Sequence, residues 1–261
     1  MPEGDSLFRL AARLAPVLEG KSVLGLDFPR SALQGHDLVG QRIEKVEARG
    51  KNLLVRFSGN RTLHLHLRMT GRVSVLRGAA ARPWPSAALV LDVEGFRVVC
   101  TGAPRVRLLK TDALHADARL RRVGPDLLGG AFDAEAALRN LRARASVPIG
   151  EALMDQRALA GIGNIYKSEL LFRHGLDPFA PVACFTDDEL RALVADAEVL
   201  LRRNAEARSG RRITRKAGHP ADHSVYLRAR RPCFDCGALV RSKAQELRTT
   251  YYCPRCQAPR G

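Results

Sequence analysis

The first residues of the chain place an amine and a carboxyl group side by side. The chain begins Met1-Pro2-Glu3, and methionine aminopeptidases generally remove an initiator methionine when the next residue is as small as proline. Removal would leave a free secondary amine on Pro2, and chain-terminal amines have pKa values of about 7.7 to 8.0. An amine nucleophile beside an acid is a combination that covalent catalysis uses. Pro2 and Glu3 are therefore candidate catalytic residues, provided that Met1 is removed.

Four of the six cysteines fall in one short segment near the end of the chain. Cys233-x2-Cys236 and Cys253-x2-Cys256 are separated by sixteen residues, which is the length of one β-hairpin. Two such pairs can enclose one Zn²⁺ in a tetrahedron of thiolates. A redox pair is the alternative. Because four protein ligands leave no open coordination position, we expect one structural Zn²⁺ that does not activate water.

A third group of residues could bind an anion. Gly161 and Gly163, in "ALAGIGNIYKSELLF", separate two stretches of helical texture. Glycines permit a tight turn, and the first backbone N–H groups of the following helix favour a phosphate. Asn164 could add a side-chain donor, although a purely structural turn remains the alternative. A dinucleotide site is disfavoured, because no strand precedes the motif and no third glycine follows at the required spacing.

The overall charge points to a polyanionic partner. The 261 residues include 43 Lys plus Arg against 27 Asp plus Glu, which gives a net charge of +16 and a pI near 10.5. Such an excess is typical of nucleic-acid binding, with a generally basic proteome as the alternative. No apolar run is long enough to span a membrane, and no secretion signal begins the chain. We therefore expect an intracellular protein without a membrane partner.

The two remaining cysteines give no sign of a secreted disulfide framework. Cys100 and Cys184 stand in apolar surroundings, in "VVC" and "VAC". We interpret both as small buried residues, because free cysteine behaves as a small hydrophobic side chain.

The spacing of apolar residues predicts an α+β multidomain fold. Residues 5–19 have the periodicity of an amphipathic helix. Short strand-like runs follow up to about residue 110, and they favour an antiparallel sandwich or barrel; the runs are "SVLGLDF", "RIEKVEA", "NLLVRF", "TLHLHLRM", "ALVLDV" and "FRVVC". In "TLHLHLRM", Leu63, Leu65 and Leu67 alternate with His64, His66 and Arg68. We expect the leucines to face the core and the other face to be free to meet a ligand.

The second half of the chain has a helical pattern. Helices are expected over 133–144, with Asp133 as N-cap, and over 148–156, 165–174 and 187–208. A basic stretch, 208–231, is interrupted by glycine and proline and predicts a mobile loop. The expected domains are 1–118, an N-terminal β-sandwich catalytic domain; 119–132, a linker; 133–222, a helical DNA-binding domain; and 223–261, a zinc finger.

Taken in order, these motifs resemble the formamidopyrimidine-DNA glycosylase and endonuclease VIII family of base-excision repair enzymes. The resemblance covers nearly the whole chain, through "MPEG", "VEARGKNLLVRF", "HLRMTGR", "RRVGPDLL", "LMDQRALAGIGNIYKSELLF" and "PCFDCG…LRTTYYCPRCQ". It implies an N-terminal helix with an antiparallel β-sandwich, a helix-two-turns-helix domain and a zinc-finger β-hairpin with four cysteine ligands. It also implies a cytoplasmic, nucleoid-associated monomer whose partner is double-stranded DNA containing oxidised bases or abasic sites.

The resemblance further implies a bifunctional DNA glycosylase and AP lyase. Pro2 matches the nucleophile that forms a Schiff base, and Glu3 matches the general acid. Lys51 matches the lysine that assists proton transfer during β-elimination, and Arg248 matches the finger arginine of δ-elimination. Five further positions match DNA contacts of the family: Arg68, Met69, Arg105, Arg122 and Asn164. Met69 would fill the stack left by the flipped base, with core packing as the alternative.

The chain departs from the family pattern at two places. Ser6 stands where many members have a glutamate, and the aromatic wedge of the purine-type branch is missing near Arg107. The chain opens with "PEG" rather than "PEL", which favours the endonuclease VIII branch of the family. This branch acts mostly on oxidised pyrimidines, which are therefore the expected substrates. The alternative function is a non-catalytic or lyase-only zinc-finger protein that binds damaged or abasic DNA.

Overall fold

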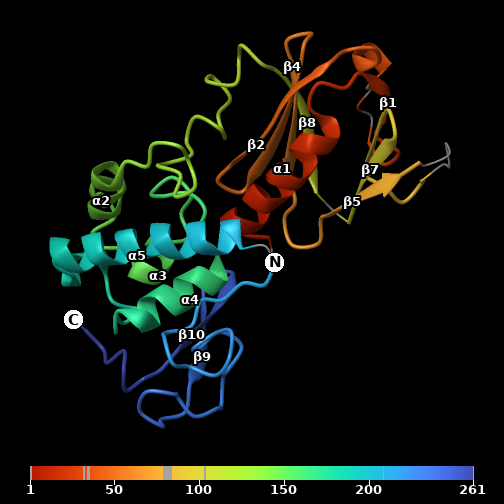
Figure 1. Cartoon of the computed structure of the whole chain (residues 1–261). Coiled ribbons are helices and arrows are strands. Elements are labelled where there is room, and N and C mark those ends of the chain that lie inside the picture. The colour runs from red at the N-terminus through yellow and green to blue at the C-terminus, as the bar shows by residue number, and fades with distance from the viewer. Residues whose placement is uncertain are drawn as a thin grey trace. The chain divides into compact units, whose positions relative to one another are not determined.

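The computed structural model describes residues 2–31, 33, 36–78, 84–102, 104–207 and 209–260. Met1, whose removal Pro2 requires, and Arg208, the expected end of the last helix, lie outside the described residues. The chain forms two compact units, 1–121 and 122–261, which are described separately. Figure 1 colours the first from red to yellow and the second from green to blue.

The described residues of the first unit form one α-helix and two antiparallel four-stranded sheets, in the orders β1-β6-β7-β5 and β2-β3-β4-β8. The expected helix and β-sandwich are thus confirmed. The elements are α1 (Gly4–Leu18), β1 (Val23–Asp27), the 3₁₀ turn η1 (His36–Leu38), β2 (Ile43–Arg49), β3 (Asn52–Phe57), β4 (Arg61–His66), β5 (Arg72–Arg77), β6 (Leu89–Val93), β7 (Phe96–Thr101) and β8 (Arg105–Lys110).

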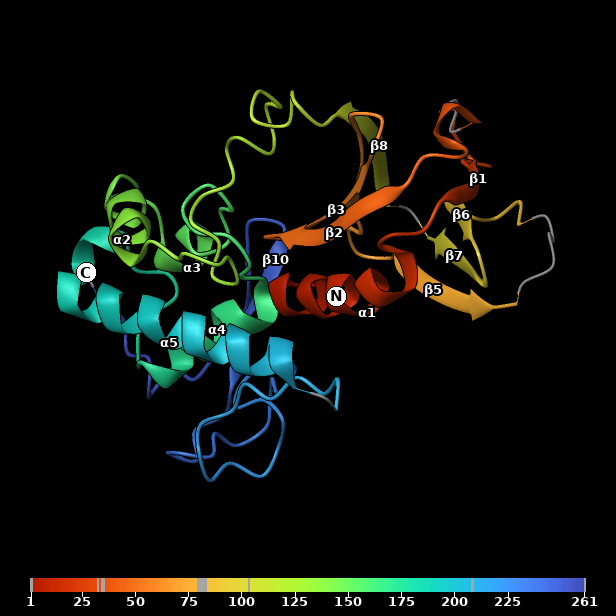
Figure 2. The same cartoon turned by 45° about the horizontal axis from the view of Figure 1, so that its top comes forward.

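Helix α1 is held by its apolar stripe. Leu7, Leu10, Leu14 and Leu18 are buried in one cluster with residues of both sheets. The helix packs against β2 and β3, as Figure 2 shows. Burying a leucine side chain contributes roughly 1.5–3 kcal/mol, so this stripe fixes the helix and, with it, the residues at its first turn.

Two strands, β5 and β8, were missed from the sequence. Both lie at the end of their sheet's strand order, and along each strand most residues are exposed or only half buried. Neither strand has a fully buried residue, whereas β1 and β2, which also end a strand order, do have buried residues. The two-residue periodicity that revealed the other strands is therefore weak in these two.

The expectation that His64 lies on a free face is wrong. His64 is only 2% exposed, because residues after β8 cover this face through a second small core of Leu54, Leu114 and Leu120. The imidazole Nε2 is 2.8 Å from Asn52 Oδ1, an acceptor, so Nε2 carries the hydrogen. Burial and repulsion from Arg107 lower the pKa of His64 from 6.5 to about 4. The residue is a neutral structural histidine at pH 7.

The lowered pKa predicts acid destabilisation of the first unit. Between pH 6.5 and 4 the unfolded chain binds a proton at His64 and the folded chain does not, so stability falls as pH falls across this window. The full effect is about 3 kcal/mol. Urea unfolding monitored by the fluorescence of Trp84, the only tryptophan of the chain, measures it.

Substitution His64→Gln should lower stability at pH 7 and flatten its dependence on pH between 4 and 6.5. His115→Gln is the matched control, because His115 is exposed on the same unit, and it should retain the dependence. An unchanged pH slope in His64→Gln would contradict the assignment.

The second unit consists of helices and a two-stranded hairpin. Its elements are α2 (Ala134–Arg142), α3 (Ile149–Ala152), α4 (Asn164–Arg173), the 3₁₀ turn η2 (Val182–Cys184), α5 (Asp187–Glu206), β9 (Arg241–Gln245) and β10 (Arg248–Tyr252). Asp133 caps α2 as expected, since its side chain accepts from Ala136 N. The helix expected over 148–156 is reduced to the single turn of α3.

Two further expectations need correction. Cys184 is exposed, whereas Cys100 is buried as expected. The described part of the 208–231 stretch contains no helix or strand, but Thr214, Ser224 and Val225 are fully buried within it. The segment is an irregular but packed loop. Among the described residues, no helix is long and apolar enough to cross a membrane.

Candidate functional site

Pro2 lines a groove in the first unit. The groove has a volume of about 900 Å³ and is bordered by α1, by the turn after β4, and by the end of β7. Ser6, Met69 and Thr101 are among its other lining residues. The position at which a nucleophilic amine was expected is thus half exposed beside open space that can receive a ligand.

The turn after β4 has a backbone that fixes Met69 at the groove. Arg68 has a φ of +56°, and Gly71 N donates to Leu67 O at 2.9 Å. A Cβ on Gly71 would lie 2.4 Å from Leu67 O, so glycine is required there. Met69 is consequently 55% exposed and is not part of the core. The alternative interpretation of Met69 as a core side chain does not fit this position.

Glu3 lies at the start of α1. It is the N-cap residue, and its carbonyl oxygen accepts from Ser6 N and Leu7 N at 3.0 and 3.2 Å. Its side chain is fully buried, as is that of Asp5, which pairs with Arg9 at 3.2 Å. The positive end of a helix stabilises nearby negative charge. Ser6, which stands where many family members were expected to have a glutamate, lines the groove, and its Oγ donates to Asp5 Oδ1 at 3.4 Å.

Three cations that were expected at the site act on His66. Desolvation lowers the pKa of His66, and repulsion from Lys51, Arg105 and Arg68 lowers it further. These residues come from the β2–β3 turn, the start of β8 and the turn after β4, so the sheet brings together positions far apart in sequence. From the sequence, His66 was placed with Arg68 on the face expected to meet a ligand, but it was assigned no role. A polyanion placed here would reduce the repulsion among the cations.

Asn164 is the first residue of α4, after a turn that the side chain of Gln156 supports. Gln156 Nε2 donates to Ile162 O at 3.0 Å, and Gln156 Oε1 accepts from Gly161 N at 3.1 Å. Gly161 has a φ of +112°, which favours glycine. This role of Gln156 was missed from the sequence, because nothing in its neighbourhood distinguishes it from a surface residue.

Asn164 and Arg248 belong to one assembly within the second unit. Asn164 Nδ2 donates to Thr249 O at 2.8 Å, next to Arg248 at the start of β10. Buried Lys167 Nζ donates to Thr250 Oγ1 at 2.7 Å, and this hydroxyl donates to Gln245 Oε1 at 2.7 Å. The finger hairpin is therefore fixed to the first turns of α4. Arg122, by contrast, is an exposed residue at the start of the unit.

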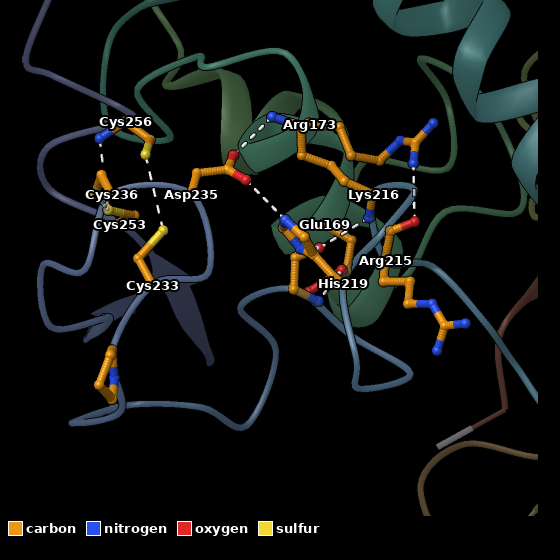
Figure 3. Close-up of polar contacts among 12 residues, drawn as sticks. Glu169, Arg173, Arg215, Lys216, His219, Cys233, Asp235, Cys236, Cys253 and Cys256 are labelled. Carbon is orange, nitrogen blue, oxygen red and sulfur yellow. Dashed lines mark hydrogen bonds and ion pairs between the residues drawn. The ribbon is translucent and has the colours of Figure 1, made fainter.

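The four finger cysteines form a compact cluster, shown in Figure 3. Their sulfur atoms all lie within 4.8 Å of one another, with 3.8 Å between Cys233 and Cys256 and 3.5 Å between Cys236 and Cys253. Ligands at about 2.3 Å in a tetrahedron would be about 3.8 Å apart. The donor set and its spacing fit a metal ion with four thiolate ligands.

Loss of one thiolate should unfold the finger locally. For Cys236→Ser we expect loss of bound metal and rapid amide exchange over β9 and β10, because metal binding and folding of such a hairpin are coupled. Metal content and hydrogen exchange by mass spectrometry measure this. Cys184→Ser is the matched control, since Cys184 is exposed outside the cluster; equal effects of the two substitutions would contradict the assignment.

Comparison with known proteins identifies relatives along the full chain. The family model described as "Formamidopyrimidine-DNA glycosylase N-terminal domain" matches residues 1–109, and that described as "Formamidopyrimidine-DNA glycosylase H2TH domain" matches residues 123–215. The "Probable endonuclease 8 2" of Streptomyces coelicolor is 42% identical over 99% of this chain and 94% of its own length. The "DNA-(apurinic or apyrimidinic site) lyase Nei2" of Mycolicibacterium smegmatis is 37% identical over 98% of this chain and 99% of its own.

More distant relatives carry a different name. The "Formamidopyrimidine-DNA glycosylase" of Chloroflexus aggregans is 34% identical over 98% of both chains. Among solved structures, the MutM (Fpg) protein of Thermus thermophilus superposes with a TM-score of 0.81 at 29% identity, covering 98% of each chain.

Proposed function

The chain belongs to the formamidopyrimidine-DNA glycosylase family, and from this we propose that it is a DNA glycosylase and AP lyase of DNA repair with Pro2 as its nucleophile. The observation that carries the proposal is the position of Pro2 on an open groove, beside exposed Met69 and next to buried Glu3. These groups are a nucleophile, a wedge and an acid within one unit.

The chemistry suits a secondary amine. Attack of the Pro2 nitrogen on C1′ of the deoxyribose breaks the bond to the base, and ring opening gives an iminium ion. Having no N–H proton to lose, this ion stays cationic and accepts the electron pair released when a proton leaves C2′; the 3′ phosphate then departs.

The remaining residues are assigned roles within this scheme. Glu3 protonates the departing base or the opening sugar ring. Lys51 assists proton transfer in β-elimination, and Arg248 assists the second, δ-elimination. Met69 occupies the vacated stack after base flipping. Asn164 contacts a phosphate of the DNA, Arg68 and Arg122 make further DNA contacts, and Arg105 is a second inserted residue.

We further assign oxidised pyrimidines as substrates and Zn²⁺ as the metal. Four relatives called endonuclease 8 or Nei2 share 35–42% identity with this chain, against 31–34% for four called formamidopyrimidine-DNA glycosylase, which agrees with the "PEG" opening. Zn²⁺ accepts four thiolates in a closed tetrahedral site and would act structurally, without activating water.

Borohydride trapping tests the nucleophile. The protein incubated with abasic-site duplex and borohydride should form a covalent adduct, and Pro2→Gly should abolish trapping while DNA binding persists. The same gel resolves β- from β,δ-elimination products by the 3′ end left on the DNA. Mass spectrometry of the purified protein establishes whether Met1 has been removed.

The controls separate chemistry from folding. Ser31→Ala, at an exposed position on the same unit, should trap as the unchanged protein does. Folded protein that starts at Pro2 and binds DNA without trapping would overturn the proposal and indicate a non-catalytic binding protein.

Glu3→Gln tests the acid and the substrate class together. An abasic site has no base to protonate, so base removal should fall by about 10² to 10⁴ and cleavage of abasic DNA by much less. Parallel time courses with thymine glycol, 8-oxoguanine and abasic duplexes measure both effects, and for the unchanged protein thymine glycol should be removed faster than 8-oxoguanine. Equal losses on all three duplexes would contradict the assigned role.

A further inference from the structure

Residues 209–226, called here the basic loop, lie against the start of α4. Arg212 stacks over the Tyr166 ring at 5.4 Å, and Tyr166 is two residues after Asn164, the proposed phosphate contact. The loop also contains Arg211, Arg215 and Lys216. It therefore presents cations at the end of α4 that, on the proposed function, faces DNA.

The two arms of the basic loop are attached to helix α4. Glu169, fully buried on α4, accepts from the backbone N–H groups of Ser224, Val225 and Tyr226 at 2.7, 2.7 and 2.8 Å. On the other arm, Arg173 Nη1 donates to Arg215 O at 3.1 Å while its guanidinium pairs with Asp196 of α5. Figure 3 shows Glu169, Arg173 and Arg215 in this arrangement.

The tip of the basic loop is attached to the cysteine cluster instead. Asp235 lies between Cys233 and Cys236, and its two oxygens contact Lys216 Nζ and His219 Nε2, each at 2.7 Å. In Figure 3 Asp235 extends from the cysteines toward His219. The His219 ring is buried and lies 5.0 Å from the ring of Phe234 and 6.2 Å from that of Phe172.

The hydrogen bonds form one continuous chain with consistent donors. Lys216 N donates to Ser224 Oγ at 3.0 Å, so the hydroxyl hydrogen is available to His219 Nδ1 at 2.9 Å. A neutral imidazole then donates from Nε2 to Asp235. The chain runs from the cysteine cluster through Asp235, His219 and Ser224 to Glu169. Phe172 and Val225 pack in the same small core as Cys233 and Cys253.

We propose that Asp235 is a positioning residue that transmits the folded state of the four-cysteine cluster to the basic loop, through His219 and Ser224. The cluster then does more than fold its own hairpin, since it also determines where Lys216 and Arg212 are held beside α4. This inference goes beyond the proposed function in naming a structural coupling, and only its effect on catalysis rests on that function.

Hydrogen exchange of the full-length, metal-loaded protein tests the coupling. Asp235→Ala should keep its metal and accelerate exchange of amides in residues 212–226 by about tenfold, the effect of losing one hydrogen bond to a charged group, while α5 is unchanged. His219→Ala, at a residue outside the Cys233–Cys256 finger segment, should give the same pattern. In the double variant Asp235→Ala/His219→Ala, exchange should be only slightly faster than in the more affected single variant, because both residues act through one contact.

Asp188→Ala is the matched control, since the Asp188 side chain is 97% exposed on α5 of the same unit. It should leave exchange of the basic loop unchanged. Unaltered exchange of residues 212–226 in metal-loaded His219→Ala, or fully additive effects in the double variant, would overturn the proposal. If Asp235→Ala alone loses its metal, the exchange rates of metal-loaded His219→Ala decide whether the coupling exists.

Kinetics on abasic duplex provide a second readout. Asp235→Ala should raise KM and reduce the dependence of DNA binding on salt, because cations of the loop are no longer held in place, while kcat changes little. An equal loss in kcat would assign Asp235 to the chemistry and overturn the positioning role. Failure of the unchanged protein to cleave any duplex would refute the proposed function, whereas the exchange measurements would still decide this inference.

Discussion

The candidate active site depends on holding a chain terminus still. Terminal residues are normally the least ordered part of a domain, yet here Pro2 stands immediately before a helix whose apolar stripe is buried against two sheets. The side chain of Glu3 is buried at the helix start, and its carbonyl accepts the first backbone N–H groups. The packing of leucines along α1 thus sets the position of the Pro2 nitrogen, which lies outside the helix. The geometry of the candidate site is therefore a consequence of hydrophobic burial.

Electrostatic repulsion between cations is a second constraint on the candidate site. A net charge of +16 is unfavourable for a compact chain, and the structure concentrates part of it instead of dispersing it. Lys51, Arg68 and Arg105 all depress the pKa of His66, which shows that they act on the same small volume. Strands and turns that are stable for reasons of packing hold these cations together, and the repulsion between them favours binding of a polyanion.

Local patterns in the sequence predicted local features well. The periodicity of 5–19, the alternation in β2–β4 and the spacing of the cysteines correspond to α1, to one sheet and to the metal-binding cluster. Predictions from the sequence failed where a segment distant in sequence determines the burial or the hydrogen bonds of a residue. His64 is buried because residues 111–120 cover its face, and β5 and β8 lack a clear pattern because neither strand has a fully buried residue. Glu169 resembles any helical glutamate, since its partners follow 55 to 57 residues later.

The hydrogen bonds between α4 and the finger hairpin have a consequence for how the second unit folds. Lys167, Thr250 and Gln245 are buried and bonded to one another, and Gln245 Nε2 also donates to Pro178 O at 3.0 Å. Separating the hairpin from the helices would break these hydrogen bonds and open the packing around them, so the two parts stabilise each other. Helices and finger, although distinct in sequence, are therefore expected to melt together as one cooperative block.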